Sequence, residues 1–364
     1  CGNNMAVTIK RIAELAGVST GTVDRALHDR GRVNPKVAQR IKQIAEELNY
    51  QPNSVAKSLS TRNKNMKIAV ILHIDVPNSF FFDVYVGILK AKAEIQDFGI
   101  GVEIYRCRDF DADCQAALID QALKDGSSAI AIVPINAPSI REKINGLHAQ
   151  GFPVVFLSNM IEETECLGFV GCDYWKSGEL TAGLLHLLSP NGGKLLLFSP
   201  SFQMQGHVLR ARGMEQRLLE DYPQIHLQQV YELSGDKIQD YRLTKQAIQT
   251  WPDTDMVVCP GAYSDGNLQA LMEDARQIGR NTVCYDDSAE VDALIGSRKI
   301  QAAILQSPQD QGYIAVKTLF DYLVAGKRPK AQNNYVRLMI LIKENLSEAD
   351  LARQEYQQGA LGTL

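Results

Sequence analysis

Apolar residues near the start of the chain recur at the spacing of an α-helix. The periodic positions are Ile9, Ile12, Ala13, Leu15 and Ala16. Gly17 stops the pattern, and Ser19 is a natural N-cap for a second helix at about residues 20–28. Asn34 and Pro35 then supply the N-cap and the first-turn proline of a third helix. The apolar positions of this third helix are Val37, Ile41, Ile44, Ala45 and Leu48. The pattern therefore predicts a small three-helix core.

Two short helices joined by a turn of three or four residues that contains a glycine are typical of a helix-turn-helix, whose second helix lies in the major groove of DNA. The first residues of the second helix are small or polar, as a groove-facing surface requires. These residues are Thr20, Gly21, Thr22, Asp24 and Arg25. Arg25 is the best candidate for a bidentate contact to guanine. On spacing alone, a generic helical bundle is the alternative.

From Lys67 onward, short apolar runs alternate with amphipathic helical patterns. The predicted strands are residues 68–74, 102–106, 129–133, 154–157, 167–170, 194–198, 225–233, 256–259, 282–285 and 302–306. The predicted helices include residues 82–98, 139–149, 175–188, 205–220, 239–250, 265–278 and 309–325. This alternation predicts doubly wound parallel sheets with helices on both faces. About 300 residues exceed one such unit, so we expect two similar lobes with a ligand between them, at the carboxyl ends of the strands.

Charge is distributed unevenly along the chain. Residues 1–67 hold twelve Lys or Arg and five Asp or Glu, a net charge of +7. The remainder holds 26 basic and 37 acidic residues, a net charge of −11. A basic head on an acidic body is expected where only one end of a protein meets a polyanion.

Several classes of protein are disfavoured. The seven cysteines include no CxxC pair or Cys/His cluster, so we interpret them as thiols in a reducing compartment and expect no metal. No apolar run reaches the ~18 residues of a membrane span, and no signal-peptide pattern precedes the first helix, so we expect a cytoplasmic protein without a membrane partner. GxGxxG, P-loop, HExxH and GxSxG motifs are absent, so we expect neither an enzyme nor a cofactor.

The segment after the third helix carries a more specific pattern. Leu48-Asn49-Tyr50 and Pro52-Asn53 lead into Val55-Ala56 and Leu59. With Val7-Thr8-Ile9, Ile12-Ala13, Ala16-Gly17-Val18-Ser19, Thr22-Val23 and Arg25, these residues resemble the lac repressor (LacI/GalR) family. The resemblance implies a homodimer on near-palindromic double-stranded DNA. It also implies that Leu59 of a hinge helix wedges a base step in the minor groove. Asp24 and Gly21 depart from residues common in the family, which puts the familiar operator sequence in doubt.

The DNA-contacting residues implied by this resemblance lie in the head and the hinge. They are Thr8, Ser19, Thr20, Gly21, Thr22, Asp24, Arg25, Asn53, Ala56, Lys57 and Leu59.

Nearly all of residues 67–343 resemble the type I periplasmic binding protein fold, especially ribose- and galactose-type binders. In the first lobe the resemblance implies ligand contacts from Asn78, Phe80, Phe81 and Asn136. The three aromatics at 80–82 have an alternative role as a helix-start staple into the core. Ser158 and Asn159 stand where sugar binders often have Asp-Arg, so a charged clamp is missing there.

In the second lobe, the implied contacts are Asp173, Arg210 and Asp286, with Gln306 near the strands that join the lobes. Arg212 is the second choice for the arginine. Where such binders carry Asn-Asp, this chain has Pro-Gly-Ala followed by Tyr263, which could stack on a ligand. An ordinary salt bridge is the alternative for the charged residues. The arginine, the aspartates and the glutamine suit a neutral ligand rich in hydroxyl groups.

These observations predict three regions. They are a helix-turn-helix domain at 1–52, a hinge helix and linker at 53–66, and an effector-binding domain at 67–364. The first lobe should comprise about 67–171 and 308–333, and the second about 172–306 and 334–364. We expect a transcriptional regulator, with a repressor favoured, whose operator affinity is controlled allosterically by a sugar or polyol. A transport solute-binding protein shares the sensor fold but has no use for a basic head.

Overall fold

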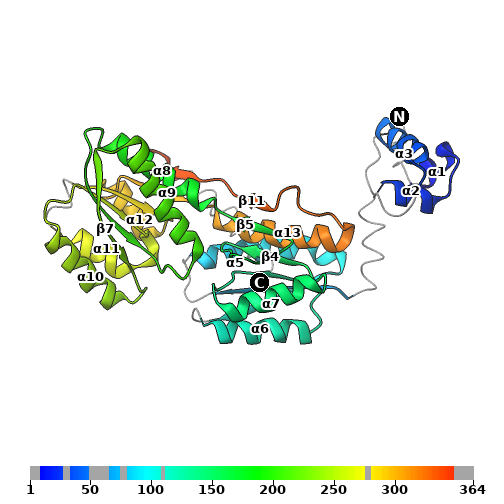
Figure 1. The fold of residues 1–364 in the computed structure, drawn as a ribbon, viewed down its shortest axis with the longest axis horizontal. Helices are drawn as coiled ribbons and strands as arrows, with labels where there is room; N and C mark the ends of the chain where they lie inside the picture. Colours follow the sequence, from blue (N-terminus) through cyan, green and yellow to red (C-terminus); the bar gives the residue numbers. More distant parts are fainter. Residues whose placement is uncertain are drawn as a thin grey trace. The chain divides into compact units, whose positions relative to one another are not determined.

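The structure is a computed structural model that describes residues 9–27, 33–48, 65–73, 80–107, 111–274 and 280–347. The side chains at positions 9, 10, 24 and 262 are not described. Contacts within the chain divide it into two units, residues 1–63 and residues 64–364 (Figure 1). Each unit is described by itself.

The amino-terminal unit contains the three predicted helices. They are α1 (Ile9–Ala16), α2 (Thr20–Leu27) and α3 (Pro35–Glu47). Gly17 adopts φ 67°, the left-handed conformation that ends α1. The Asn34 side chain caps α3 by accepting a hydrogen bond from the Lys36 amide at 3.0 Å. Ile12, Val23 and Ile41 are fully buried and bring one residue from each helix into the core.

The first lobe of the larger unit is a six-stranded parallel sheet in the order β11-β5-β4-β3-β1-β2. Its strands are β1 (Lys67–His73), β2 (Gly101–Cys107), β3 (Ala129–Ile132), β4 (Val154–Leu157), β5 (Gly168–Gly171) and β11 (Asn333–Tyr335). Two helices cover one face, α5 (Phe80–Ile95) and α13 (Pro308–Ala325). Two cover the other, α6 (Ala112–Lys124) and α7 (Pro138–Ala149). A 3-10 turn, η1 (Gln96–Phe98), follows α5.

The second lobe repeats this plan with the order β12-β10-β9-β8-β6-β7. Its strands are β6 (Gly193–Ser199), β7 (Ile225–Glu232), β8 (Met256–Cys259), β9 (Asn281–Tyr285), β10 (Ala302–Leu305) and β12 (Met339–Leu341). β12 alone runs antiparallel to its neighbour. One face carries α8 (Tyr174–Leu188) and α9 (Gln205–Asp221), and the other carries α10 (Lys237–Thr250), α11 (Asp265–Met272) and α12 (Ala289–Gly296). The 3-10 turns are η2 (Gly261–Tyr263) and η4 (Lys343–Asn345).

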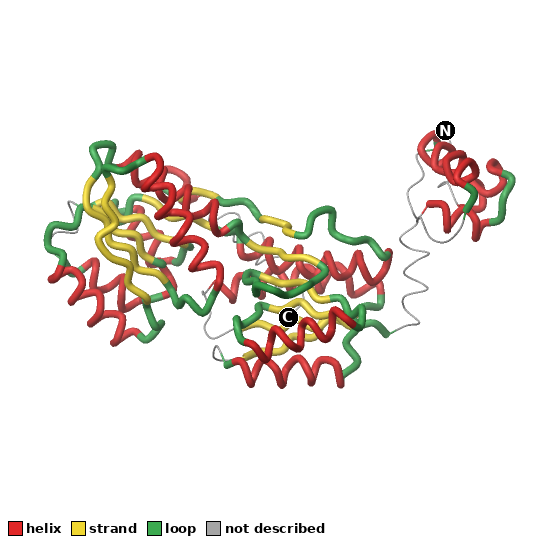
Figure 2. The backbone as a smooth tube through the Cα atoms, viewed as in Figure 1, coloured by secondary structure: helices red, strands yellow, loops and turns green. Residues whose placement is uncertain are grey.

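The chain passes between the lobes three times. The first crossover, residues 172–173, joins β5 to α8; the second, residues 306–307, joins β10 to α13. The third, residues 336–338, joins the edge strand β11 to the edge strand β12. Figure 2 shows the strands of each lobe lying between layers of helices. The predicted fold class, two doubly wound lobes after a small helical head, is therefore confirmed.

The structure contains two α-helices and two strands that the sequence pattern did not predict. α6 and α12 are regular helices, and both begin with a capping side chain, Asp111 and Ser288. The strands β11 and β12 are only three residues long, and all three residues of β11 are exposed. Backbone pairing with β5, and not an apolar pattern, defines β11.

Glycines allow one pair of helices in each lobe to approach closely. A Cβ on Gly87 of α5 would lie 1.9 Å from the carbonyl oxygen of Gln309 in α13, and one on Gly312 would lie 2.0 Å from that of Val84. In the second lobe, a Cβ on Gly178 of α8 would lie 2.1 Å from the carbonyl oxygen of Arg210 in α9. These contacts are with backbone, so a side chain could be admitted only by moving a helix.

We predict that Gly87→Ala destabilises the larger unit by about 1–3 kcal/mol or more, because the added methyl group overpacks the α5–α13 contact. Gly146→Ala is the control, because Gly146 lies in α7 with no atom within 4 Å of an added Cβ. That change should be neutral or stabilise by about 0.5–1 kcal/mol, the helix preference for alanine. Thermal and urea unfolding of the full chain measure both effects. Equal stability of the two variants would contradict the close-packing argument.

Candidate ligand-binding and DNA-binding sites

Arg210 is a buried cation of the larger unit, only 6% exposed; Arg280 is 3% exposed but pairs directly with the Asp274 carboxylate at 2.9 Å. Arg210 lies on the second turn of α9, which Gly178 allows to pack closely on α8. Its guanidinium carbon lies 3.9 Å from the ring centre of Tyr285 and 5.2 Å from that of Tyr174. These aromatic contacts partly replace the hydration that burial removes. The Nε atom of Arg210 has no hydrogen-bond partner within the described part of the chain.

Gln306 and Asp286 balance the charge of Arg210. Arg210 Nη2 donates to Gln306 Oε1 at 2.7 Å, and Gln306 Nε2 donates to both carboxylate oxygens of Asp286 at 2.9 and 2.8 Å. Burial raises the pKa of Asp286 to about 6, although Arg210 and Gln306 oppose that rise. The neighbouring Cys172 thiol stays protonated at neutral pH, because burial raises its pKa to about 12. The three predicted residues therefore form one hydrogen-bonded network at the carboxyl ends of β9 and β10.

Three strand ends around this network adopt a backbone conformation that favours glycine. Ser158 after β4, Asp286 after β9 and Ser307 after β10 have φ values of 58°, 59° and 47°. Such residues cost about 1–3 kcal/mol each and persist where the surrounding structure holds them in place. Strain of this kind is concentrated at ligand sites and switch regions.

Two predicted first-lobe residues, Ser158 and Asn159, are buried and bonded to protein groups. Ser158 Oγ donates to Gln311 Oε1 at 2.7 Å. Asn159 Nδ2 donates to the carbonyl of Pro134 at 2.7 Å, and its Oδ1 accepts from the Gly206 amide of α9 at 3.4 Å. The Ser158 side chain therefore bonds within the first lobe, and Asn159 also bonds the second lobe through Gly206. Asn136, by contrast, is exposed.

The predicted aromatic residues are only partly available to a ligand. Phe80 and Phe81 are half-buried against the first-lobe core, with ring centres 5.2 Å apart and edge-to-face. This favours the helix-start staple for part of each ring. Tyr263 lies on η2 and packs against the second-lobe core, and burial raises its pKa. Asp173 is half-buried and serves as the N-cap of α8, where its side chain accepts from the Lys176 amide at 3.0 Å. Asn78 lies outside the described residues.

Sequence reasoning missed Tyr174 and Tyr285, the two rings that enclose Arg210. Each is adjacent in sequence to a predicted residue, Tyr174 after Asp173 and Tyr285 before Asp286. Their position at a strand end or crossover, beside residues already selected, was the available signal.

Little space is open beside Arg210 in this conformation. The cavity there has a volume of about 10 Å³ and is lined by His207 and Tyr285 among others, which suffices for about one water molecule. Burial lowers the pKa of His207 to about 4, so its ring is neutral at physiological pH. This cavity is too small to admit a sugar.

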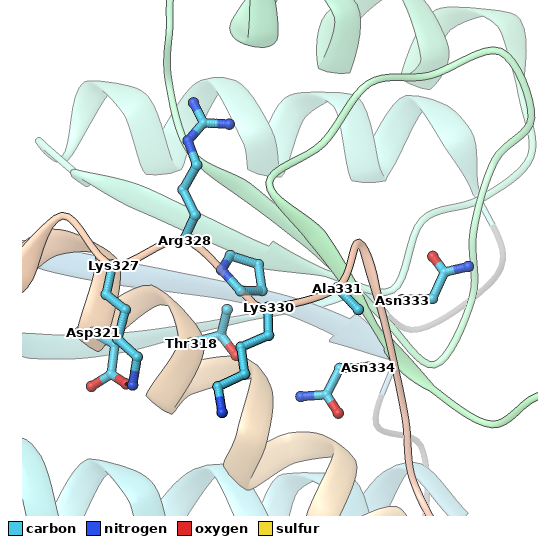
Figure 3. Close-up of a pocket in the computed structure, with 9 residues that line it drawn as sticks. Thr318, Asp321, Lys327, Arg328, Lys330, Ala331, Asn333 and Asn334 are labelled. Carbon is cyan, nitrogen blue, oxygen red and sulfur yellow. The ribbon is translucent and has the colours of Figure 1, made fainter. Parts of the chain in front are cut away.

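A larger hollow of about 310 Å³ lies at another part of the first lobe (Figure 3). It is lined by Thr318 and Asp321 of α13, by Lys327 to Ala331 and by Asn333 and Asn334 of β11. None of the predicted ligand residues contributes to it. We do not assign it as the effector site, because its lining is largely exposed and lacks the buried, convergent polar groups seen around Arg210.

The head presents a polar surface at the start of α2. Ser19, Thr20, Gly21 and Arg25 are exposed. Ser19 Oγ accepts from the Thr22 amide at 3.2 Å and bonds the Thr22 hydroxyl at 2.9 Å, and Arg25 Nη2 donates to that hydroxyl at 3.4 Å. The start of α2 is thus capped by Ser19, and the polar side chains of Ser19, Thr22 and Arg25 are linked through the Thr22 hydroxyl.

Other predicted DNA contacts cannot be placed. Thr8, Asn53, Ala56, Lys57 and Leu59 lie outside the described residues, as does the side chain of Asp24.

Comparison with known families decides the identity of the chain. Residues 68–328 match the model of the periplasmic binding protein domain, and residues 8–53 match that of bacterial regulatory proteins of the lacI family. The chain belongs to the lacI family of bacterial regulatory proteins. The predicted resemblance is thereby confirmed, and so is the prediction of a DNA-binding transcriptional regulator that is not an enzyme.

Individual relatives match most of the length of this lacI-family regulator. The ribose operon repressor of Bacillus subtilis (strain 168) is 29% identical over 334 residues, which span 89% of this chain and 94% of that protein. The ribose import binding protein RbsB of the same organism is 24% identical over 288 residues, 77% of this chain and 89% of that protein. The structure of GanP, a glucose-galactose binding protein from Geobacillus stearothermophilus, matches with a TM-score of 0.69 and 19% identity, over 77% of this chain and 98% of that chain. This last likeness shows the fold.

Two further findings concern only the described residues. None of their helices combines the length and apolar character needed to cross a membrane. No cluster of three or more His, Cys, Asp or Glu side chains among them could hold a metal ion.

We predict that Arg25→Ala in this lacI-family regulator relaxes base preference at one operator position, because a bidentate guanine contact is worth about 1–3 kcal/mol of discrimination. Lys57→Ala is the control, since loss of a phosphate contact weakens binding to all sequences about equally. Selection of binding sites from random DNA, followed by sequencing, measures both. An unchanged sequence preference for Arg25→Ala would refute the assigned role.

We also predict a pH dependence that originates at Asp286. Its folded-state pKa of about 6 lies above the ordinary value of 3.8, so the folded protein holds this proton more tightly than the unfolded chain does. The contribution of Asp286 to stability therefore falls as pH rises from about 4 to about 6, and is constant above. Asp286→Asn cannot titrate, so its stability relative to wild type should increase across that window. Urea unfolding as a function of pH measures the difference; parallel curves would contradict it.

Proposed function

We propose that this regulator represses transcription by binding a near-palindromic operator as a homodimer, and that a neutral sugar or polyol bound beside Arg210 changes its affinity for that operator. The observation that carries the effector site is the buried network of Arg210, Gln306 and Asp286 between two tyrosine rings. It combines donors, acceptors and aromatic faces at the carboxyl ends of parallel strands, where ligands of such sheets bind.

The chemistry of this network favours hydroxyl groups over charged ones. A guanidinium fork and a carboxylate can each pair with neighbouring hydroxyls, and tyrosine rings can stack on the C–H faces of a sugar. The charge of Arg210 is already balanced by Asp286 through Gln306, so an anionic ligand has no uncompensated cation to meet. The names of two relatives, a ribose operon repressor and a ribose import binding protein, make D-ribose the first sugar to test.

The dimer and the cytoplasmic location belong to the same proposal. A single helix-turn-helix reads one half-site, and a near-palindromic operator presents two, so two copies of the basic head are needed. An operator-binding protein acts where the chromosome is, which is the cytoplasm of a bacterium.

A transport protein for solutes is the second candidate, because the sensor resembles the ribose import binding protein. The head discriminates between the two. A basic helix-turn-helix serves DNA binding and contributes nothing to the delivery of a sugar to a transporter.

We predict that a sugar screen by thermal shift, beginning with D-ribose and including hexoses, myo-inositol and nucleosides, identifies a stabilising ligand. A ligand at 100 times its Kd stabilises by about 2.7 kcal/mol, which is several degrees for a domain of this size. Arg210→Met should abolish the shift. Arg212→Met is the matched control, because Arg212 lies two residues along α9 and is exposed. If only the Arg212 variant lost the thermal shift, the ligand would bind at Arg212 and not at Arg210.

A further inference from the structure

Five residues around the first two crossovers form a closed ring of contacts, here called the crossover ring. Its members are Ser158, Tyr174, Arg210, Gln306 and Gln311. Arg210 donates to the Gln306 side chain, and Gln311 Nε2 donates to the Gln306 carbonyl at 2.8 Å. Ser158 Oγ donates to Gln311 Oε1 at 2.7 Å. The Tyr174 hydroxyl donates to the Ser158 carbonyl, and the Tyr174 ring faces Arg210, which closes the ring.

The crossover ring joins the two lobes through side chains as well as through the chain. Arg210 belongs to the second lobe, and Ser158 and Gln311 belong to the first. Gln306 lies in the second crossover directly after β10, and Tyr174 begins α8 directly after the first crossover. Gln311 is 0% exposed, and both of its amide atoms are bonded, one toward each lobe. It is the member that connects the effector network to the end of β4.

The backbone around Gln311 is held under strain. Ser158 and Ser307 are left-handed, with φ values of 58° and 47°, and Gln311 bonds Ser158 and the residue before Ser307. The Ser307 hydroxyl also donates to the Arg337 carbonyl at 3.1 Å, which ties the second crossover to the third. A segment of this kind changes conformation when the bonds that hold it change.

An effector has to disturb this arrangement in order to bind. The space beside Arg210 is about 10 Å³, far less than a sugar occupies, and the Arg210 and Gln306 side chains are bonded to each other. A ligand that takes either side chain's hydrogen bonds therefore alters the second-lobe half of the crossover ring.

We propose that Gln311 is the coupling residue of this regulator: it transmits occupancy of the effector site to the first lobe through its bonds to Gln306 and Ser158. The inference rests on the proposed function, since it concerns how the same site acts on operator affinity. Gln311 is a positioning residue, because its side chain is 0% exposed and each of its two amide atoms bonds a protein group.

Gln115 provides a matched control for the alternative, a glutamine that only satisfies buried backbone groups. It is also 0% exposed, and its Nε2 donates to the Val133 carbonyl at 2.9 Å while its Oε1 accepts from the Ile135 amide at 2.9 Å. Both of its partners lie in one loop of the first lobe, so it bridges no crossover. Replacing either glutamine by methionine removes two bonds from a buried amide and keeps the length of the side chain.

The experiment compares Gln311→Met and Gln115→Met in the full chain. Operator affinity is measured with and without saturating D-ribose, and D-ribose affinity is measured separately by calorimetry. We expect Gln311→Met to keep its affinity for D-ribose within a few-fold of wild type. The ratio of operator affinity without D-ribose to operator affinity with D-ribose should change at least about fivefold toward 1, and fivefold is the lower end of ordinary allosteric coupling. Gln115→Met should lose comparable thermal stability and keep the ratio. Equal ratios in wild type and in Gln311→Met would overturn the proposal.

A second readout needs no sugar and separates this inference from the proposed function. If D-ribose leaves operator binding of the wild-type protein unchanged, that result counts against D-ribose as the effector, and hydrogen exchange then tests Gln311. Loss of the Gln311 bonds should reduce amide protection at residues 158–159 and also at 174–177, which the amide atoms of Gln311 do not touch. Loss of protection confined to α13 would show a local packing role and would overturn the proposal.

Discussion

The burial of one guanidinium group organises the sensor of this regulator. A charge that is 6% exposed is costly to remove from water, and its neighbours must replace the lost hydration. Two tyrosine rings, a glutamine amide and a carboxylate reached through that amide do so here. These groups come from the start of α8 and from the ends of β9 and β10, and Arg210 itself lies on α9, so the position of Arg210 fixes how four elements meet. The glycine contact between α8 and α9 brings the arginine into that position.

Most of the architecture could be read from the sequence because its strands are buried on both faces. Runs such as residues 154–157 and 256–259 are entirely apolar, and their ends agree with the structure. β11 could not be recognised in this way, because Asn333, Asn334 and Tyr335 are exposed and become a strand only by pairing with β5. A local pattern contains no information about such a distant partner.

The same distinction applies to the candidate site: some of its residues could be predicted from the sequence, and the contacts of others could not. Family resemblance selected Arg210, and positions at strand ends selected Asp286 and Gln306; the structure brings the three residues into one network. The sequence could not show whether the polar residues after β4 face a ligand or the protein. Ser158 and Asn159 are bonded to protein groups, and the left-handed backbone at Ser158 determines the direction of that turn. Gln311 lies in an apolar helix face, where one sequence gives no sign that a buried amide has partners in both lobes.

The return of the chain to the first lobe has a consequence for biosynthesis. The sheet that begins with β1 is completed only by β11, and the helix packed on α5 is α13, so residues 172–307 of the ribosomal product separate one part of this lobe from the other. Until α13 leaves the ribosome, the face of α5 that contains Gly87 has no partner, and the nascent first lobe exposes apolar surface. The second lobe, by contrast, lies mostly within one continuous stretch and can form earlier. The lobe encoded first thus waits for its second part until most of the other lobe has been made, and chaperones have reason to engage it during that interval.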